Sequence, residues 1–409
     1  STCTFGTRRK SPCSPCFHQP QSHTPQHTHH ITMAASKLDI VVWGATGFTG
    51  SLTAEYLAEH APATIKWGIA GRSRARLEGV RDRLCAVNPK CKDLPILIGD
   101  SSSQESIDGV VSQTRVVISC AGPFNKYGTP VVDACVRFAA DYCDITGEYP
   151  WVRTIVDKYH EKAQAAGVRI VPCCGFDSIP SDLGTLMVVH YIKNKLGHEC
   201  GPVKQYLVSM KGGVSGGTIA SMVDIIQTQP DPAWLTNPYL LKQGSERDAP
   251  PHPDDATVRT IAFSKDIGKW TGPGVMAAIN TKVVHRSNSL LHYGDAFTYN
   301  EVSGQKGFLP ALLYLLGLGL FVMMMYFSLT RALLQRLVLP KPGEGPSKAQ
   351  RDSGSFHVVV VGQSIPPKGT PSTSVMGAVH GIKDPGYGET AKMLAESGMC
   401  LALDRAKTP

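Results

Sequence analysis

The stretch LDIVVWGATGFTGSL, residues 38–52, decides the fold class of this chain. Residues 38–43 are apolar and β-prone, as is typical of a central parallel strand. Glycines at positions 44, 47 and 50 follow at once and lead into a helical pattern that begins near Thr49. A strand that passes through a glycine-rich turn into a helix predicts a dinucleotide-binding unit.

Each glycine of this turn has its own expected role. We expect Gly44 to allow the tight turn, Gly47 to let backbone approach a diphosphate, and Gly50 to let the helix pack on the sheet. The first helical N–H groups then face the phosphates. The spacing is G-x-x-G-x-x-G rather than G-x-G-x-x-G, and glycine-rich turns without a ligand are common. The turn alone therefore leaves both interpretations open.

The second predicted strand, residues 64–70, bears on the choice of cofactor. It ends in Gly71-Arg72-Ser73, where an NAD site would carry an acidic residue for the ribose hydroxyls. A guanidinium at this place is the expected partner of a 2′-phosphate. The alternative is a solvated arginine in a loop. With the glycine turn upstream, Arg72 favours NADPH over NAD.

Strand-like and helical segments alternate through the next hundred residues. Predicted strands cover 94–99, 115–120, 141–146 and 168–172, and a predicted amphipathic helix covers 130–140. This rhythm predicts an α/β fold with a Rossmann-type doubly wound parallel sheet, whose ligands bind beyond the carboxyl ends of the strands. The residues expected to bind the cofactor there are Gly44, Ala45, Thr46, Gly47, Phe48, Thr49, Gly50, Arg72, Ser73, Asp100, Ala121, Gly122 and Pro123.

A reduction by hydride transfer often needs a proton donor as well. Two residues are weak candidates for this role. They are Tyr127, in the turn after the fourth predicted strand, and Asp177, after the sixth predicted strand. Each has a structural alternative that we favour: Tyr127 caps its loop, and Asp177 caps the next helix through the turn D-S-I-P. The catalytic residue is therefore unknown from the sequence.

Composition excludes some classes of function. The 409 residues carry a formal net charge of +8, and their lysines and arginines are scattered rather than striped. The sequence shows no basic helix with aromatic residues between the basic ones, so we expect no nucleic-acid partner. The twelve cysteines lack framework spacing, so free thiols on the cytosolic side fit better than secreted disulfides. Those in predicted buried elements are Cys120, Cys135, Cys143, Cys173 and Cys174.

The first 32 residues have a different character. They are rich in Ser, Thr, Pro and His, and no acidic residue precedes Asp39. Cys13 and Cys16, with histidines nearby, suggest a metal-binding tract, and the same stretch suggests a transit peptide to mitochondria or plastids. We favour a third interpretation, in which the protein starts at Met33. We predict no metal site in the folded part.

Residues 200–305 change to a mixed pattern of strands and helices. The stretch GGVSGGT, residues 212–218, precedes a helix with an apolar face. The residues of that face are Ile219, Met222, Val223 and Ile226. The turn holds an anion or is merely capped, and the sequence weighs these alternatives evenly. Residues 228–256, rich in Pro and Asp, predict a surface loop.

An apolar insert, residues 307–330, contains no charge and is flanked by Lys306 and Arg331. Its length suffices to cross a bilayer, but the strand-like segments 356–362 and 375–380 follow it and are expected in the same sheet as earlier strands. A crossing is therefore not expected. The alternatives are a hairpin in one leaflet, bent near Pro310 or Gly317-Leu318-Gly319, and burial at a protein interface.

The stretch RALLQRLVL follows the insert and is similar to an interfacial amphipathic helix with cationic residues. We therefore favour attachment of residues 307–339 to a membrane or a lipid monolayer, such as that of a lipid droplet.

Several motifs, in this order and spacing, resemble one family. They are VVWGATGFTG, AGRS, AGPFxxYG, YCDITGE, CGFDSIPSD, GGVSGGT and DPGYGETAKML. Their combination resembles the saccharopine dehydrogenase-like oxidoreductases, in particular the eukaryotic saccharopine dehydrogenase-like proteins and the bacterial trans-acting enoyl reductases of glycolipid synthesis. True saccharopine-forming enzymes are more distant, because their first turn is usually G-x-G-x-x-G.

The resemblance covers nearly everything from residue 38 to the end. The family generally carries a further segment after its last helix, so we expect a truncated C-terminus, and it offers no agreed catalytic residue to place here.

The resemblance and the patterns together predict four segments. They are a disordered leader (1–37), an NADP(H)-binding Rossmann domain (38–199), an α+β substrate and dimerisation domain (200–381) that carries the membrane-associating insert 307–339, and a C-terminal helix (382–409) that returns to the Rossmann domain.

We expect an NADP(H)-dependent oxidoreductase that reduces a carbonyl or enoyl group of a lipid or other hydrophobic substrate. We expect it to be associated with a membrane or a lipid droplet, on the cytosolic face. A homodimer is one expected assembly. The alternatives are a nucleotide-binding scaffold or redox sensor without turnover and, more weakly, a saccharopine-type amino-acid dehydrogenase.

Overall fold

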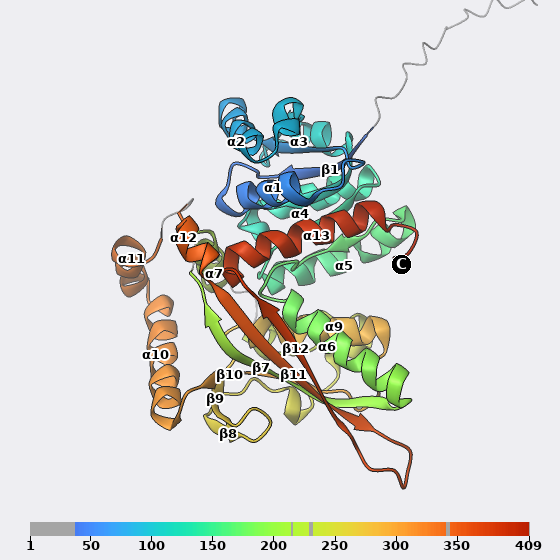
Figure 1. Cartoon of the computed structure of the whole chain (residues 1–409), viewed down its shortest axis with the longest axis vertical. Helices are drawn as coiled ribbons and strands as arrows, with labels where there is room; N and C mark the ends of the chain where they lie inside the picture. Colours follow the sequence, from blue (N-terminus) through green and yellow to red (C-terminus); the bar gives the residue numbers. More distant parts are fainter. Residues whose placement is uncertain (1–36, 214–215, 229–231, 341–343, 409) are drawn as a thin grey trace, which may run out of the picture. The chain divides into compact units, whose positions relative to one another are not determined.

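A six-stranded parallel sheet forms the first half of the described chain, in the order β3-β2-β1-β4-β5-β6 (Figure 1). Its strands are β1 (Leu38–Trp43), β2 (Trp67–Gly71), β3 (Ile96–Ile98), β4 (Thr114–Ser119), β5 (Asp141–Asp144) and β6 (Ile170–Val171). The strand order reverses between β1 and β4, which is where doubly wound sheets bind their ligands. The predicted Rossmann-type sheet is confirmed.

The computed structural model describes residues 37–213, 216–228, 232–340 and 344–408. The expectations for the leader, including Cys13, Cys16 and Met33, lie outside these residues, as do those for Val214 and Ser215.

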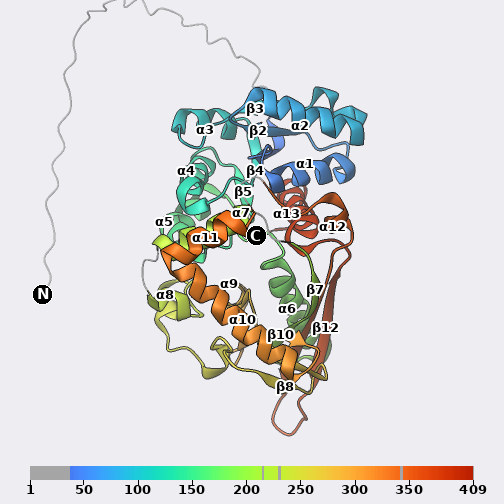
Figure 2. The ribbon, with the colours of Figure 1, turned by 90° about the vertical axis from the view of Figure 1, so that its left-hand side faces the viewer.

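Helices cover both faces of the parallel sheet (Figure 2). They are α1 (Phe48–His60), α2 (Arg74–Val87), α3 (Gln104–Val111), α4 (Phe124–Arg137), α5 (Tyr149–Ala166) and α13 (Thr390–Leu403). Strand β1 shows why both faces are covered: Ile40 and Val42 are buried with α1, α2 and α13, whereas Val41 and Trp43 are buried with α3, α4 and α5. A strand buried on both faces reads as the continuous apolar run seen in the sequence.

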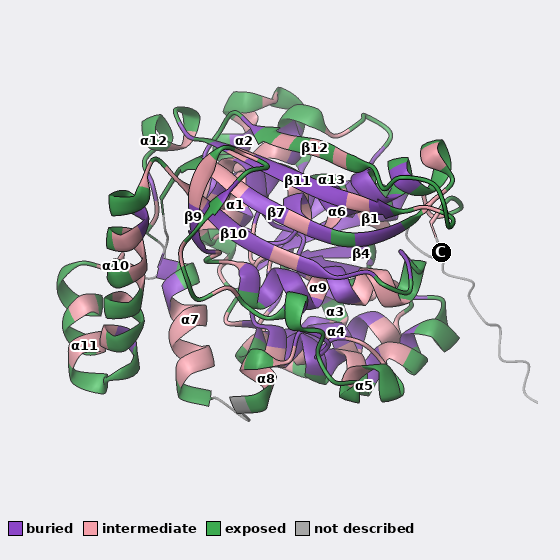
Figure 3. Ribbon diagram, turned by 90° about the horizontal axis from the view of Figure 1, so that it is seen from below, coloured by how far each residue is buried: buried purple, intermediate pink, exposed green. Residues whose placement is uncertain are grey.

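A second, mixed sheet follows in the order β12-β11-β7-β10-β9-β8. Its strands are β7 (Glu199–Lys211), β8 (Ala262–Ser264), β9 (Lys269–Pro273), β10 (Tyr299–Gln305), β11 (Ser355–Ile365) and β12 (Ser374–Gly381). Figure 3 views this sheet from the side opposite α6 (Ile179–Tyr191) and α9 (Ala277–Leu291). Val188 of α6 and Val284 of α9 belong to the apolar core beneath the sheet, together with Val360 of β11.

Shorter elements complete the described chain. They are α7 (Gly216–Thr228), α8 (Pro232–Thr236), α12 (Lys348–Asp352), the 3-10 turns Pro89–Asp93, Gly244–Asp248 and Pro253–Asp255, and the π turns Ile192–Leu196 and Pro385–Glu389.

The predicted start of one helix is wrong. The sequence predicts a helix over 130–140, but α4 already begins at Phe124. The carboxylate of Glu148 accepts hydrogen bonds from the backbone N–H groups of Phe124 (2.9 Å) and Asn125 (2.7 Å). A carboxylate that caps a helix from more than twenty residues away leaves no signal in the local pattern.

The apolar insert is one continuous helix, α10 (Phe308–Tyr326), followed by α11 (Ser328–Leu337). The predicted hairpin near Pro310 or Gly317-Leu318-Gly319 is therefore wrong. Pro310 lies in the first turn, where the N–H that proline lacks has no helical partner, and the chain instead turns at Phe327. Strand β10 before the insert and β11 and β12 after it share one sheet, as predicted.

The surface loop predicted over residues 228–256 is partly wrong, because Tyr239, Leu240 and Leu241 are buried. The guanidinium of Arg153 in α5 donates to the carbonyls of Leu240 (3.1 Å) and Lys242 (2.8 Å). These contacts hold the apolar triplet in the core, although prolines and aspartates flank it.

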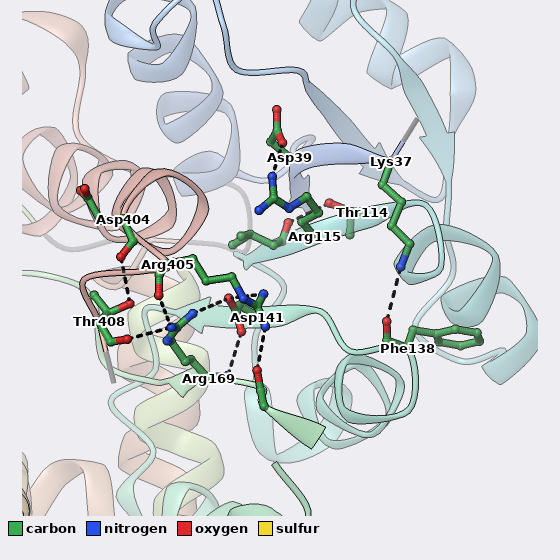
Figure 4. Close-up of polar contacts among 12 residues, drawn as sticks. Lys37, Asp39, Thr114, Arg115, Phe138, Asp141, Arg169, Asp404, Arg405 and Thr408 are labelled. Atoms are coloured by element: carbon green, nitrogen blue, oxygen red, sulfur yellow. Dashed lines mark hydrogen bonds and ion pairs between the residues drawn. The ribbon is translucent and has the colours of Figure 1, made fainter. Parts of the chain in front are cut away.

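The C-terminal segment is tied to the amino ends of the parallel strands (Figure 4). The buried Asp141, at the start of β5, accepts hydrogen bonds from the guanidinium groups of Arg169 (3.3 Å) and Arg405 (3.1 Å). Arg169 also donates to the carbonyls of Arg405 (2.6 Å) and Thr408 (2.9 Å). This cluster lies at the edge of the sheet opposite the ligand crevice.

Candidate functional site

The glycine-rich turn after β1 has the geometry of a phosphate cradle. Gly44 has φ of +80°, a left-handed conformation that disfavours residues with a Cβ. A Cβ at Gly50 would lie 2.3 Å from the carbonyl oxygen of Gly44, so α1 packs against the turn only because residue 50 is glycine. Gly47 is the N-cap of α1 and provides no side-chain cap. Unsatisfied N–H groups at such a helix start fit a bound diphosphate.

The ends of β2 and β4 border this turn. A Cβ at Gly44 would lie 3.1 Å from the Cβ of Ala121, directly after β4. The hydroxyl of Thr46 lies 3.7 Å from the Cβ position of Gly71, at the end of β2. Ala45 between them is fully buried. The structure thus brings together three of the segments that the sequence predicts to bind the cofactor.

Arg72 is exposed beside this turn. Among the described residues, no carboxylate lies within ion-pair distance of its guanidinium. Hydrogen bonds from Ser102 lower the pKa of Asp100, and the positive charge of nearby Arg72 contributes to the shift. Ser73 has a structural role, because its hydroxyl accepts the N–H of Arg76 (3.4 Å) and caps α2. Arg72 therefore remains available to a phosphate, whereas the hydroxyl of Ser73 is already engaged.

Helix α7, from the second half of the chain, joins the site through Glu148. The hydroxyl of Ser221 in α7 donates to this carboxylate (2.6 Å), and Asn125 Nδ2 donates to Asp224 Oδ2 (3.1 Å). Burial raises the pKa of Glu148. Because Glu148 also caps α4, one carboxylate positions α7 next to the segment that follows Gly122.

The loops after β5 and β6 are held together by Asp144. This buried carboxylate accepts hydrogen bonds from the N–H of Thr146 (2.9 Å), the N–H of Cys173 (3.1 Å) and the hydroxyl of Tyr142 (2.8 Å). Burial raises the pKa of Asp144 to about 7. All of its hydrogen bonds go to structural groups, so we regard Asp144 as the support of these loops.

Asp177 lies in the loop after β6, next to the loop after β5. Its Oδ2 is 3.8 Å from the Cβ position of Gly147. The carboxylate does not cap α6: the N-cap is Ser178, without a side-chain cap, and Asp177 has no hydrogen bond to the described part of the chain. Burial raises the pKa of Asp177 to about 6. The capping interpretation is thus wrong, and the donor role stays a prediction.

Tyr127 lies within α4 rather than in a loop. Its N–H donates to the carbonyl of Pro123 (3.1 Å), and the ammonium of Lys126 lies 5.3 Å from its ring centre. Its hydroxyl has no hydrogen-bond partner within the described ranges. Tyr127 is half-buried.

A second group of polar side chains lies between α9 and β10. The buried Glu301 of β10 accepts hydrogen bonds from Asn280 Nδ2 (2.8 Å) and the hydroxyl of Tyr299 (3.2 Å). Burial raises the pKa of Glu301 to about 7, and the negative charge of Asp177 adds to the shift. Between residues 37 and 408, where described, no group of three or more His, Cys, Asp or Glu could hold a metal ion.

Sequence analysis missed several of these residues. Asp144 and Glu148 stand in YCDITGE, at the end of a predicted strand and directly after it, and that position was an available signal. Glu301 and Asn280 lie in a strand and a helix of the second half, and nothing in the local pattern marks them. They approach each other only through the tertiary fold.

Comparison with known proteins gives consistent matches. The family description "Saccharopine dehydrogenase NADP binding domain" matches residues 40–171. A Mycobacterium tuberculosis protein of the trans-acting enoyl reductase group is 37% identical over 398 residues, which cover 92% of this chain and 91% of that protein. The trans-acting enoyl reductases of Mycobacterium bovis and Mycobacterium ulcerans are 35% and 34% identical, with the same coverage.

A solved structure of similar fold is the apo saccharopine dehydrogenase (L-Glu forming) of Saccharomyces cerevisiae. It matches with a TM-score of 0.50 and 15% sequence identity, over 90% of this chain and 91% of that chain. At this identity the match supports the arrangement of the two sheets and says nothing about the substrate.

Proposed function

The chain belongs to the saccharopine dehydrogenase-like oxidoreductases, which carry an NADP-binding domain, and on this premise we propose that it reduces the carbon–carbon double bond of an enoyl group on a hydrophobic chain. The observation that carries the proposal is the 37% identity to the enoyl reductase group over 92% of the chain, which includes the second half. The expected cofactor, NADP, and the oxidoreductase class are confirmed.

The residues present fit NADPH, which supplies a hydride when it is bound. The left-handed Gly44 and the uncapped start of α1 suit a diphosphate, and Arg72 suits a 2′-phosphate. The segment directly after β4 borders the same turn, and we expect it to line the nicotinamide end of the cofactor site. Its residues are Ala121, Gly122 and Pro123. We assign the proton donor role to Asp177, because burial keeps part of its population protonated near neutral pH and no group in the described part of the chain hydrogen-bonds to its carboxylate.

The direct test is oxidation of NADPH in the presence of a trans-2-dodecenoyl thioester. We expect NADPH to be consumed and the saturated thioester to form, whereas the saturated thioester alone causes no oxidation. The matched 3-keto thioester distinguishes enoyl from carbonyl reduction. Binding of NADPH without turnover of either thioester would contradict the proposal and favour a nucleotide-binding scaffold.

We also propose that the protein attaches to a lipid surface through α10 and α11. Helix α10 is about 28 Å long at the rise of an α-helix, and by length and composition alone it could cross a membrane. It packs against the second sheet through the buried Ala311 and through Tyr314, whose hydroxyl donates to the carbonyl of Pro273 (3.0 Å). A helix fixed along a sheet in this way suits the plane of a lipid surface better than a crossing.

The outer face of these helices is apolar and exposed. The side chains more than half exposed are Phe308, Leu309, Leu313, Leu316, Leu320, Val322, Met323, Tyr326, Phe327, Leu329, Leu333, Leu337 and Val338. An apolar patch of this extent on a soluble surface marks a site of contact with a membrane or a partner. Arg331 caps α10 by donating to the carbonyls of Met325 (2.9 Å) and Tyr326 (3.2 Å), so Lys306 and Arg336 are the cations left for anionic lipid.

Flotation with liposomes tests the attachment. We expect the triple variant Leu313→Glu, Leu316→Glu, Leu320→Glu to lose binding by about a hundredfold or more, because each leucine that leaves water contributes roughly 1.5 kcal/mol. The control Leu290→Glu, Leu291→Glu makes the same change at exposed leucines of α9 and should float like the wild type. A triple variant that still floats would refute the attachment. Point changes are preferable to removal of 307–339, because α10 also covers β9.

The predicted homodimer stays a prediction, which sedimentation of the purified chain tests.

A further inference from the structure

The side chain of Phe48, the first residue of α1, is in contact with residues from the far end of the chain. A Cβ at Gly345 would lie 2.5 Å from two atoms of the Phe48 ring. The ring of Tyr387 meets the Phe48 ring edge-on, with ring centres 5.1 Å apart. The guanidinium carbon of Arg351 lies 5.5 Å from the centre of the same ring. Because Phe48 belongs to the glycine-rich cofactor turn, the segment around residues 345–351 borders the cofactor site.

The backbone that carries Arg351 is held in place from two sides. Helix α12 begins at a capping box, in which Ser347 and the side chain of Gln350 bind each other's backbone N–H groups. The carbonyl of Arg351 accepts the N–H of Asp384 (2.7 Å), and its Nη1 donates to the carbonyl of the buried Pro346 (2.7 Å). These contacts direct the guanidinium toward the cofactor turn.

The charge of Arg351 has no counterion in the part of the chain that the structure describes. The neighbouring carboxylate, Asp352, forms its ion pair with Lys348 (2.8 Å), and no carboxylate lies within ion-pair distance of the Arg351 guanidinium. The guanidinium is half-buried, and its bond to Pro346 uses one of its five N–H donors. Partial removal of a cation from water is unfavourable without an anion, so this position fits an anionic ligand.

The anion nearest to hand is the diphosphate of the cofactor. The first N–H groups of α1 have no side-chain cap and fit a diphosphate, and Arg351 stands over the side chain of the first residue of that helix. Each phosphate of a dinucleotide carries a negative charge, and a guanidinium binds such a group through charge-assisted hydrogen bonds. Arg72 reaches the turn from a different strand end and suits the 2′-phosphate.

We propose that Arg351 is a cofactor-binding residue whose guanidinium donates to the diphosphate held at the start of α1. The second half of the chain thereby supplies part of the cofactor site. Because NADPH and NADH both contain the diphosphate, Arg351 acts on both nucleotides, whereas Arg72 distinguishes them. This role concerns the bound nucleotide alone and is independent of the enoyl substrate.

Calorimetric titration with two probes tests this role. Inorganic pyrophosphate probes the diphosphate site, and adenosine 2′-phosphate probes the 2′-phosphate site. Arg351→Met loses the charge but keeps an unbranched side chain against Phe48, and we expect it to weaken binding of pyrophosphate and of NADH by about 10- to 100-fold. Binding of adenosine 2′-phosphate should not change, whereas Arg72→Ala should weaken it. Unchanged pyrophosphate binding in Arg351→Met overturns the proposal.

Lys348→Met is the matched control. It removes the same charge from the same helix, at a side chain that is 76% exposed, and should leave the affinity for pyrophosphate unchanged. Equal losses in Lys348→Met and Arg351→Met would show a general effect of charge on α12 rather than a contact, and would overturn the proposal.

Salt distinguishes a direct contact from a role confined to holding the carbonyl of Pro346. With Arg351→Met, the affinity for pyrophosphate should fall less steeply with NaCl than in the wild type, because one ionic contact is gone. Weaker binding with the wild-type salt dependence would mean that Arg351 acts only through the backbone, against the proposal.

The wild-type chain provides a further measurement, which decides the point even if Arg351→Met does not fold. Phenylglyoxal modifies accessible arginines, and mass spectrometry of peptides gives the rate at each one. We expect saturating NADH to slow the modification of Arg351 and to leave that of the exposed Arg83 in α2 unchanged. An unchanged rate at Arg351 overturns the proposal. A wild type that binds NADPH but reduces no enoyl thioester would contradict the proposed function alone, since these measurements follow binding.

Discussion

Arg72 is the residue on which cofactor choice depends. It is exposed directly after β2, beside the phosphate cradle, and its positive charge contributes to the lowered pKa of Asp100. We expect Arg72→Ala to weaken NADPH binding by about 10- to 100-fold, because a charge-assisted hydrogen bond contributes roughly 1.5–3 kcal/mol. NADH binding should not change. Calorimetric titration with both nucleotides measures the difference, and Arg83→Ala, in the second half of α2, is the control. Equal losses for both nucleotides would exclude a 2′-phosphate partner.

Asp177 gives activity a defined dependence on pH. The group donates a proton only in its acid form, and its pKa is raised to about 6, so activity should fall as the pH rises above 6. Asp177→Asn should lower kcat by about 100-fold or more and abolish this limb. A pH profile of kcat in the enoyl thioester assay tests both. Unchanged turnover in Asp177→Asn would return the donor role to Tyr127.

The same raised pKa has a consequence for stability. An unfolded aspartate has a pKa of about 3.9, so the folded protein binds the extra proton and Asp177 contributes stability at low pH. That contribution is lost as the pH rises through about 6. Asp177→Asn cannot ionise, so its stability does not fall in this way as the pH rises. We expect the variant to be at least as stable as the wild type at pH 8, and urea unfolding measures this. Low activity in that variant could then not be ascribed to unfolding.

Residue types at strand ends were the part of the site that could be predicted. Gly44 and Gly50 have the conformation and the close packing that their spacing indicates, because a strand–turn–helix unit restricts backbone geometry locally. Ser73 shows the limit of such prediction, since a hydroxyl after a strand serves equally well as a helix cap. Glu301 could not be predicted, because only the packing of β10 near α9 gives it the partner Asn280.

At the scale of elements, the apolar insert shows a prediction from residue types, the bend near Pro310 or the glycines, that is wrong. Its length and lack of charge predicted lipid contact, and Pro310 and the glycines suggested a bend, but the backbone continues as one helix. A proline in the first turn is neutral, and glycines inside a helix weaken it without breaking it. Helix continuity depends on neighbours such as β9, which the local sequence does not encode.

Glycine-to-alanine changes in α10 distinguish a helix from a hairpin in lipid. Within the described ranges, no atom lies within 4 Å of a Cβ at Gly317 or Gly319. Gly317→Ala with Gly319→Ala should therefore stabilise α10 by about 1 kcal/mol per site and leave liposome binding intact. Circular dichroism with and without liposomes, together with flotation, tests this. Loss of binding would show that the lipid-bound state bends at these glycines.

At the scale of the whole molecule, the C-terminal segment stabilises the parallel sheet from the edge opposite the site. Asp141→Ala leaves the guanidinium groups of Arg169 and Arg405 without their shared carboxylate (Figure 4). We expect a loss of about 3 kcal/mol in the free energy of unfolding, because removing one partner of a buried ion pair is costly. The affinity for NADPH should not change.

Arg115→Ala is the matched control for this cluster. It removes the more exposed pair of Arg115 with Asp39 (3.0 Å) at the same edge of the sheet and should lower stability by less than about 1 kcal/mol. Urea unfolding compares the two variants. Equal losses would show that burial of Asp141 does not determine the strength of its contacts.

The doubly wound parallel sheet could be predicted, because apolar runs and glycine turns alternate regularly along residues 38–172, whereas the order of its strands comes from the structure. The start of α4 could not be predicted, since the distant Glu148 caps it. In the second sheet, β7 pairs with β10 and β11, which lie about 90 and 150 residues further along the chain. Pairings between such distant segments are not encoded by any local pattern.

The measurement that most directly tests the central claim is deuterium transfer from NADPH labelled at C4 of the nicotinamide to a trans-2-dodecenoyl thioester, with liposomes present. The account predicts saturated thioester that carries one deuterium at C3, formed with labelled NADPH and far more slowly with labelled NADH. Mass spectrometry of the product reads both outcomes. Saturated product without deuterium, equal transfer from both nucleotides, or no saturated product at all would contradict the assignment of this chain as an NADPH-dependent enoyl reductase.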